Sequence, residues 1–338
     1  MAIQWLRCGH HVYVVSTWSE SRAASSMLYH LLLQTVKTQQ SAGVSPGQPH
    51  LLLYHLDDDK DVKKAVKNLS KKASGGSLYV IADEVGSDLS INNFQTLCDK
   101  LLIQVPRLHL WAASYFHKNA PSGWQVEHLT RPLRSPPAVV REVEQDKKII
   151  KHRDVKPYSE RGVPNHTDGP PVTRLYHRGH SCHRSADCVT CGREVASFLH
   201  SLRVGVTERN TTSTTLTDTS SGTTPCLQWR DVLLLYWDDV SGDSGMVTEL
   251  QEAGIPVRVM KDDDIEDVAT ARSDVVWMAD GHHVRGLERK VVVCLGDSVD
   301  DSFVPTIPEL FYKTFRLDLM SRCTSQLVIV YANDWMWQ

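Results

Sequence analysis

Residues 78–84 are the stretch that most constrains how this chain can fold. Leu78-Tyr79-Val80-Ile81 places four apolar or aromatic residues in succession, which predicts a strand buried on both faces. Two adjacent carboxylates, Asp83 and Glu84, follow where that strand would leave its sheet. In open α/β sheets, ligands bind outside the carboxyl ends of the strands. An aspartate there can hold Mg²⁺ through water, and the next glutamate can orient a water against a phosphate. Solvated loops carry such pairs too, so their meaning depends on the rest of the chain.

Strand and helix patterns alternate through most of the chain, which predicts an α/β fold with doubly wound parallel sheets. Residues 1–8 resemble the end of a helix that stops at Gly9. Short apolar runs predict strands at 11–16, 51–56, 78–82, 108–112, 232–237, 256–260, 275–278, 290–295 and 327–331. Helical spacing of apolar residues predicts helices at about 19–36, 57–72, 94–103, 187–203, 244–253 and 308–325.

The alternation breaks once, and this break predicts two domains. Residues 1–145 form the expected first domain. Residues 146–186 are rich in charge, proline and glycine and predict a linker or surface loop. Residues 187–338 form the expected second domain, within which the Thr/Ser-rich segment 207–224 predicts a disordered loop.

Composition narrows the class of protein. The 338 residues are 41% hydrophobic and 23% charged, as in soluble globular proteins. The net charge is −3, so any nucleic-acid contact must be local. No apolar run approaches the roughly 20 residues that span a bilayer, and the N-terminal sequence lacks the apolar core of a signal peptide. We therefore expect a cytoplasmic or nuclear protein with reduced cysteines and no membrane partner.

Two further constellations lie beside predicted strands. The segment 281–288 contains Gly286, which lets a backbone approach a ligand closely, and Glu288, which can accept a hydrogen bond from a ribose or a base. Arg322 precedes the last predicted strand, and its rigid fork suits a γ-phosphate. The alternatives are an ordinary loop between strands and an arginine that faces a helix dipole.

The ordered set of these segments resembles the superfamily 1 helicases, in the branch of UvrD-like proteins and the C-terminal helicase-like region of Schlafen proteins. The similarity covers nearly the whole chain. Asp83-Glu84 matches the Walker B motif of that family, its motif II. Four other segments resemble motifs Ia, IV, V and VI, and they span residues 12–24, 129–136, 283–288 and 321–328.

The resemblance implies two RecA-like domains that bind ATP and Mg²⁺, with single-stranded DNA or RNA as a possible partner. Asp83 would hold Mg²⁺ and Glu84 would position water. Arg134 and Arg322 would reach the γ-phosphate. Gly286 and Glu288 would contribute to nucleotide binding, with the nucleic acid as the other possible contact of Glu288.

The chain departs from the family in two places. No Gly-x-x-x-x-Gly-Lys-Ser/Thr occurs in it, and it begins inside the helix that should follow that phosphate loop. The first domain is therefore expected to lack its opening strand and loop. Residues 113–117 contain no glutamine where motif III has one. These departures predict negligible ATPase activity.

The alternative is a non-enzymatic nucleotide-sensing or scaffolding module of a larger signalling or immune protein, for which protein partners are expected. The altered motif III and the Thr-rich insertion favour this alternative. The retained carboxylates and arginines favour the NTPase.

A histidine- and cysteine-rich segment raises a zinc hypothesis with His180, Cys182, Cys188 and Cys191 as ligands. Cys188 and Cys191 have zinc-ligand spacing. They also begin a helical apolar stripe that continues through Val195 and Leu199, and no second Cys-x-x-Cys completes a ligand set. Packing in a helix core is therefore the favoured interpretation.

Overall fold

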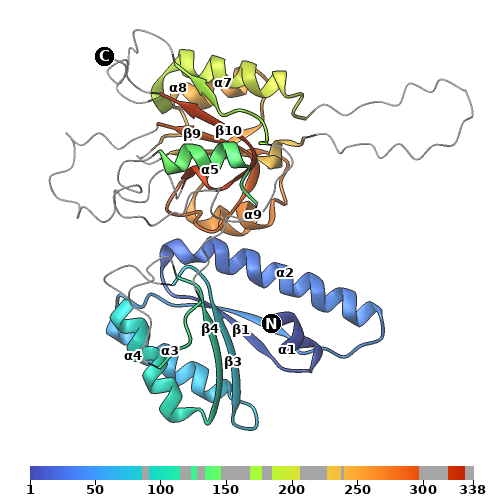
Figure 1. The fold of residues 1–338 in the computed structure, drawn as a ribbon, viewed down its shortest axis with the longest axis vertical. Coiled ribbons are helices and arrows are strands. Elements are labelled where there is room, and N and C mark those ends of the chain that lie inside the picture. Colours follow the sequence, from blue (N-terminus) through green and yellow to red (C-terminus); the bar gives the residue numbers. More distant parts are fainter. Residues whose placement is uncertain are drawn as a thin grey trace, which may run out of the picture. The chain divides into compact units, whose positions relative to one another are not determined.

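The chain forms two compact units, shown with their elements in Figure 1. The structure is a computed structural model. It describes residues 1–85, 91–114, 123–127, 134–145, 168–176, 185–205, 227–236, 240–296 and 319–331. The first unit comprises residues 1–131, 261–270 and 281–287, and the second comprises 132–260, 271–280 and 288–338. Each unit is described by itself.

The first unit contains a four-stranded parallel sheet, as the alternating pattern predicted. The strand order is β2 (Pro49–Leu53), β1 (Val12–Ser16), β3 (Ser77–Ala82) and β4 (Arg107–Ala112). Strand β3 therefore lies inside the sheet, between β1 and β4. The carboxylates that follow it lie at the carboxyl edge of the sheet.

Helices cover both faces of this sheet (Figure 1). Helices α3 (Asp59–Lys72) and α4 (Ile91–Gln104) cover one face, with a core that includes Val80, Leu97 and Leu101. The apolar stripe expected in α3 is buried and comprises Val62, Ala65, Val66 and Leu69. The other face carries α1 (Ala2–Arg7), the 3₁₀ turn η1 (Ser19–Ser21) and α2 (Arg22–Ser41). The short 3₁₀ turn η6 (Asp262–Asp264) leads into α9 (Ile265–Thr270), which packs along α2.

Strand β3 is not fully buried on both faces, so that prediction is wrong for one face. Leu78, Val80 and Ala82 are buried, whereas Tyr79 and Ile81 are half-buried. The physical reason is that α2 contacts mainly β1 and β2 on that side. The helix expected at about 19–36 is also displaced, because η1 occupies Ser19–Ser21 and α2 runs from Arg22 to Ser41.

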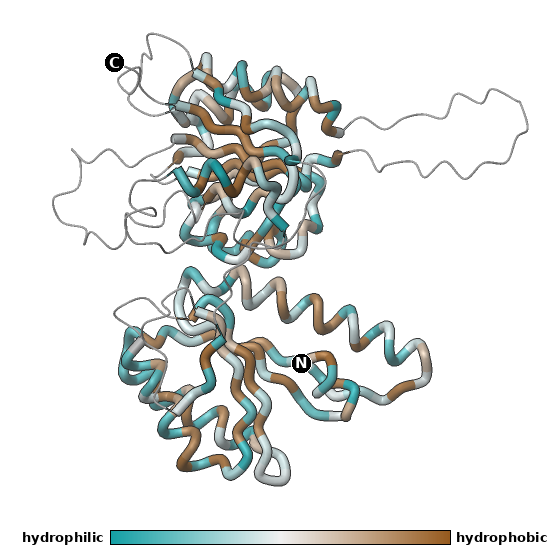
Figure 2. Tube along the Cα trace, viewed as in Figure 1, coloured by the Kyte–Doolittle hydropathy of each residue, from teal (hydrophilic) through white to brown (hydrophobic). Residues whose placement is uncertain are grey.

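The second unit contains a six-stranded sheet that is also parallel throughout. The strand order is β5 (Thr173–Leu175), β10 (Cys323–Val330), β9 (Arg289–Leu295), β6 (Val232–Tyr236), β8 (Val276–Asp280) and β7 (Val257–Val259). Its described helices are α5 (Pro137–Glu144), α7 (Val189–Ser201) and α8 (Gly245–Glu252), and the 3₁₀ turns are η4 (Ser185–Asp187) and η5 (Trp229–Asp231). Figure 2 shows hydrophobic residues concentrated along the strands of this sheet.

Two features of the second sheet were not predicted from the sequence. Strand β5 lies within the segment 146–186, where a linker was expected, and pairs with β10. Strand β10 begins at Cys323, whereas the sequence predicted a helix to residue 325 and a strand only from 327. Residues 308–318 and the Thr/Ser-rich segment 207–224 lie outside the described residues. Within the part of the chain that the structure describes, no helix combines the length and hydrophobicity that a membrane crossing requires.

Candidate carboxylate site at the edge of the first sheet

Asp83 and Glu84 directly follow the inner strand β3, and both are half-buried. The Asp83 Oδ1 atom accepts a hydrogen bond from the Glu84 backbone N–H at 3.0 Å. Burial raises the pKa of Asp83, and this hydrogen bond opposes the rise because it stabilises the carboxylate. Glu84 has φ +50°, a left-handed conformation that is uncommon for residues with a side chain. The chain therefore turns sharply at the second carboxylate.

Backbone hydrogen bonds to the β4 side hold this turn. The Val85 N–H donates to the Ala113 carbonyl at 2.9 Å, and the Ala113 N–H donates to the Ala82 carbonyl at 2.9 Å. The Ser114 hydroxyl donates to the Val85 carbonyl at 2.8 Å. The residues on both sides of the carboxylate pair are thus fixed to the sheet, and this fixes where the two carboxylates leave it.

The loop after β1 supports the same edge. The Trp18 indole Nε1–H donates to the Glu84 carbonyl at 2.7 Å, which ties this loop to the carboxylate turn. The loop is itself closed by Ser21, whose hydroxyl accepts from the Thr17 N–H at 2.9 Å and lies 2.8 Å from the Ser16 hydroxyl. Two hydroxyl side chains, those of Ser16 and Ser21, therefore hold the backbone of the loop that carries Trp18.

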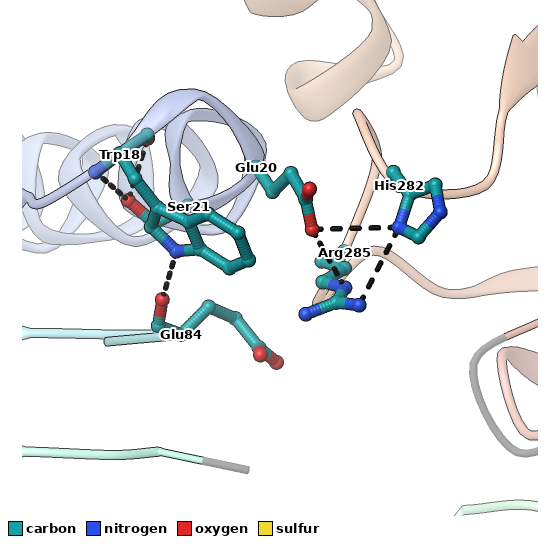
Figure 3. A network of polar contacts seen from close by, with 6 residues as sticks. All are labelled: Trp18, Glu20, Ser21, Glu84, His282 and Arg285. Atoms are coloured by element: carbon teal, nitrogen blue, oxygen red, sulfur yellow. Dashed lines mark hydrogen bonds and ion pairs between the residues drawn. The ribbon is translucent and has the colours of Figure 1, made fainter. Parts of the chain in front are cut away.

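A charged network adjoins Trp18 (Figure 3). The Glu20 Oε2 atom lies 3.2 Å from Arg285 Nε and 3.5 Å from His282 Nδ1. Arg285 Nη2 lies 3.4 Å from that same histidine nitrogen, and its guanidinium carbon lies 5.3 Å from the centre of the Trp18 ring. Arg285 is 5% exposed. Burial makes this ion pair sensitive to the loss of either partner, because an unpaired buried charge is costly.

Gly286, in segment 281–287, packs against Ala24 of α2. It has φ +75°, and an added Cβ atom would lie 2.7 Å from Ala24 Cβ and 3.5 Å from Glu84 Cγ. The neighbours of this glycine within the protein are thus a helix and the second carboxylate. Its expected contribution to nucleotide binding stays a prediction.

The second unit contains the other residues that the sequence singled out. Arg134 Nε lies 2.8 Å from Glu288 Oε2, just before β9 begins. Burial raises the pKa of Glu288, and the nearby Arg134 guanidinium opposes that rise. Arg322 is 5% exposed and precedes β10, and its carbonyl accepts a hydrogen bond from the Arg289 N–H at 3.1 Å. That Arg134 and Arg322 act on the same ligand as Asp83 stays a prediction.

Sequence reasoning missed Glu20 and Arg285 as a pair, and it did not predict the contact of Trp18 with the carboxylate turn. Glu20 and Trp18 stand directly after a predicted strand, which placed them at the carboxyl edge. The sequence contained no indication that segment 281–287 would join the first unit. The pairing of Glu20 with Arg285 follows from that long-range contact, which a local pattern does not encode.

The cysteines of the zinc hypothesis pack in the core of the second unit. Cys188 is 2% exposed and Cys191 is fully buried, with Val195 and Leu199 in the same cluster. This burial agrees with the helical stripe that the sequence predicted. His180 and Cys182 lie outside the described residues. Among those that are described, no group of three or more His, Cys, Asp or Glu side chains could hold a metal ion.

Replacing Asp83 with asparagine is expected to increase the free energy of unfolding at neutral pH. The pKa of Asp83 is 3.8 in the unfolded state and higher in the folded state. The folded state therefore binds the Asp83 proton more tightly than the unfolded state does. The stability of the wild type relative to Asp83→Asn should therefore fall as the pH rises from 3.8 through the raised folded value. Urea denaturation of both proteins between pH 3.5 and 8 measures this difference. A variant that is less stable than the wild type at pH 7 would contradict the expectation.

Comparison with known proteins gives no family assignment. No known protein-family model matches the chain, and no curated protein matches it significantly in sequence.

Proposed function

We propose that this chain is a helicase-like module of the P-loop NTPase class, similar to superfamily 1, with a divergent nucleotide site. The parent activity would be ATP hydrolysis coupled to binding of DNA or RNA. One observation carries the proposal: Asp83 and Glu84 follow an inner strand of a wholly parallel sheet, and the loop after β1 and segment 281–287 meet them. This is the edge at which open parallel sheets bind ligands.

The donor set of the site fits Mg²⁺, which prefers hard oxygen ligands. Asp83 would hold the ion through water, and the ion would neutralise phosphate charge. Glu84 would orient the attacking water. Arg134 and Arg322 would approach the γ-phosphate. The Arg134 side chain is 70% exposed, and its Nε atom lies 2.8 Å from Glu288 Oε2.

Two features predict that hydrolysis by this chain is negligible. The sequence contains no Gly-x-x-x-x-Gly-Lys-Ser/Thr, so the lysine and backbone N–H groups that cradle phosphates are missing from it. The strand β4 leads to Ala113 and Ser114, where the helicases have a glutamine. Ser114 instead hydrogen-bonds to the Val85 carbonyl.

A second candidate is a nucleotide-sensing or scaffolding module without catalysis. The buried contact of Glu20 with Arg285 favours it, because the two charges neutralise each other inside the first unit. Such a pair stabilises a fixed arrangement of loops. In such a module, a nucleotide bound beside Asp83 and Glu84 would change the affinity for a protein partner.

Thermodynamic coupling between nucleotide and nucleic acid separates the two candidates. The affinity of the full chain for a fluorescent ATP analogue with Mg²⁺ is measured with and without saturating dT₂₀ or U₂₀, and phosphate release is followed in parallel. A helicase-like module should show a change in ATP affinity of about fivefold or more, with phosphate release no faster than that of Glu84→Gln. Binding without coupling would support the scaffold. A chain that binds no nucleotide would contradict both candidates.

A further inference from the structure

A basic groove lies between α3 and α4 of the first unit, on the solvent side of these helices. Its volume is about 340 Å³. Lys63, Lys67 and Lys71 of α3 line one side, and Lys100 and Gln104 of α4 line the other. Val66 and Ser70 of α3 complete the lining. No carboxylate lines it. The groove is therefore a local cluster of positive charge in a protein whose net charge is −3.

The three lysines of α3 form a regular row. They recur every four residues, so they share one face of the helix and are separated by about 6 Å per step and about 12 Å in total. The apolar stripe of α3, which includes Val62, Ala65 and Leu69, is buried in the core, so the lysine row faces solvent. Among the described residues, none of the four groove lysines forms an ion pair, whereas Lys64 on the same helix lies 3.7 Å from Asp61.

A solvated helix face would explain a row of lysines on α3 alone. It does not explain the second wall, because Lys100 comes from a different helix and faces the same groove. Like charges four residues apart also disfavour a helix, and no acidic side chain of the groove offsets this repulsion. A ligand with several negative charges would offset it.

We propose that this groove binds the sugar-phosphate backbone of single-stranded nucleic acid. An extended row of cations suits repeated phosphates better than a single anion, and lysine binds phosphate as a point charge. No aromatic side chain lines the groove, so bases have no stacking platform there and binding should not depend on sequence. The inference goes beyond the proposed function, because it requires neither ATP nor the Asp83–Glu84 site.

Fluorescence anisotropy of labelled dT₂₀ with the full chain, without nucleotide and over a range of salt concentrations, tests the groove. The variant combines Lys63→Gln, Lys67→Gln and Lys71→Gln. Glutamine keeps a high helix propensity, so α3 should remain folded, and circular dichroism checks this. Losing three phosphate contacts should reduce the slope of log affinity against log salt by about 2. At 50 mM salt we expect binding to weaken by roughly tenfold or more.

The matched control carries Lys60→Gln, Lys64→Gln and Lys72→Gln, which remove the same charge from the same helix but from outside the groove. This control should bind dT₂₀ within about twofold of the wild type and keep most of its salt dependence. Equal losses in the two variants, or no loss in the groove variant, would overturn the proposal. Competition by a poly-glutamate peptide as strong as by unlabelled dT₂₀ would also overturn it, in favour of an acidic protein partner.

Discussion

Glu20→Ala is expected to lower the free energy of unfolding of the first unit by about 3–5 kcal/mol, the usual cost of breaking a buried ion pair. The carboxylate lies 3.2 Å from Arg285, whose side chain is 6% exposed, and 3.5 Å from His282. Its removal takes away a carboxylate that lies 3.2 Å from a buried guanidinium. The measurement is urea denaturation of the full chain, followed by circular dichroism and tryptophan fluorescence so that separate transitions of the two units are visible.

An exposed ion pair provides the control for Glu20. Asp168 lies 3.0 Å from Arg141, and their side chains are 71% and 50% exposed. Asp168→Ala should cost less than about 1 kcal/mol, because water screens the pair in the folded state. A loss for Glu20→Ala as small as that for Asp168→Ala would show that the buried network of Figure 3 does not stabilise the first unit.

Gly286→Ala is expected to destabilise the first unit by about 2–4 kcal/mol, from a left-handed backbone cost and a steric overlap. The residue has φ +75°, which disfavours any side chain. The new Cβ atom would also lie 2.7 Å from Ala24 Cβ, so segment 281–287 or α2 must move. The same denaturation experiment measures the loss.

A substitution at Gly9 separates the backbone cost from the steric overlap in the destabilisation expected for Gly286→Ala. It has φ +82° and belongs to the first unit, but nothing lies within 4 Å of an added Cβ atom. Gly9→Ala should therefore cost only the backbone term of about 1–2 kcal/mol. If Gly286→Ala cost no more than Gly9→Ala, segment 281–287 would not pack against α2 as described.

The existence of most strands was predictable, because each inner strand contains a short apolar run. The run Leu78–Ile81 predicts β3, and the run at 232–237 predicts β6. Strand order was not predictable, since it depends on contacts between segments far apart in the chain. Strand β5 was missed because three residues on a sheet edge leave too short a pattern within a stretch rich in proline and charge.

The carboxylates were placed correctly at the edge of a sheet because a sharp end of an apolar run is a local property. The surroundings of Glu84 were not predictable. Its carbonyl accepts from Trp18, and Gly286 lies beside its side chain through segment 281–287. Along the sequence, residues 132–280 lie between that segment and the N-terminal part of the first unit, which contains Trp18 and Glu84, so no periodicity links them.

Mg²⁺-dependent binding of a fluorescent ATP analogue to the full chain tests most directly whether Asp83 holds a cation beside a nucleotide. The wild type should bind the analogue more tightly with Mg²⁺ than with EDTA, and Asp83→Asn should abolish that difference. Asp280→Asn, which changes an aspartate at the carboxyl end of β8, should leave the difference intact. Equal Mg²⁺ dependence in the wild type and Asp83→Asn would contradict the assignment of Asp83 to a nucleotide site.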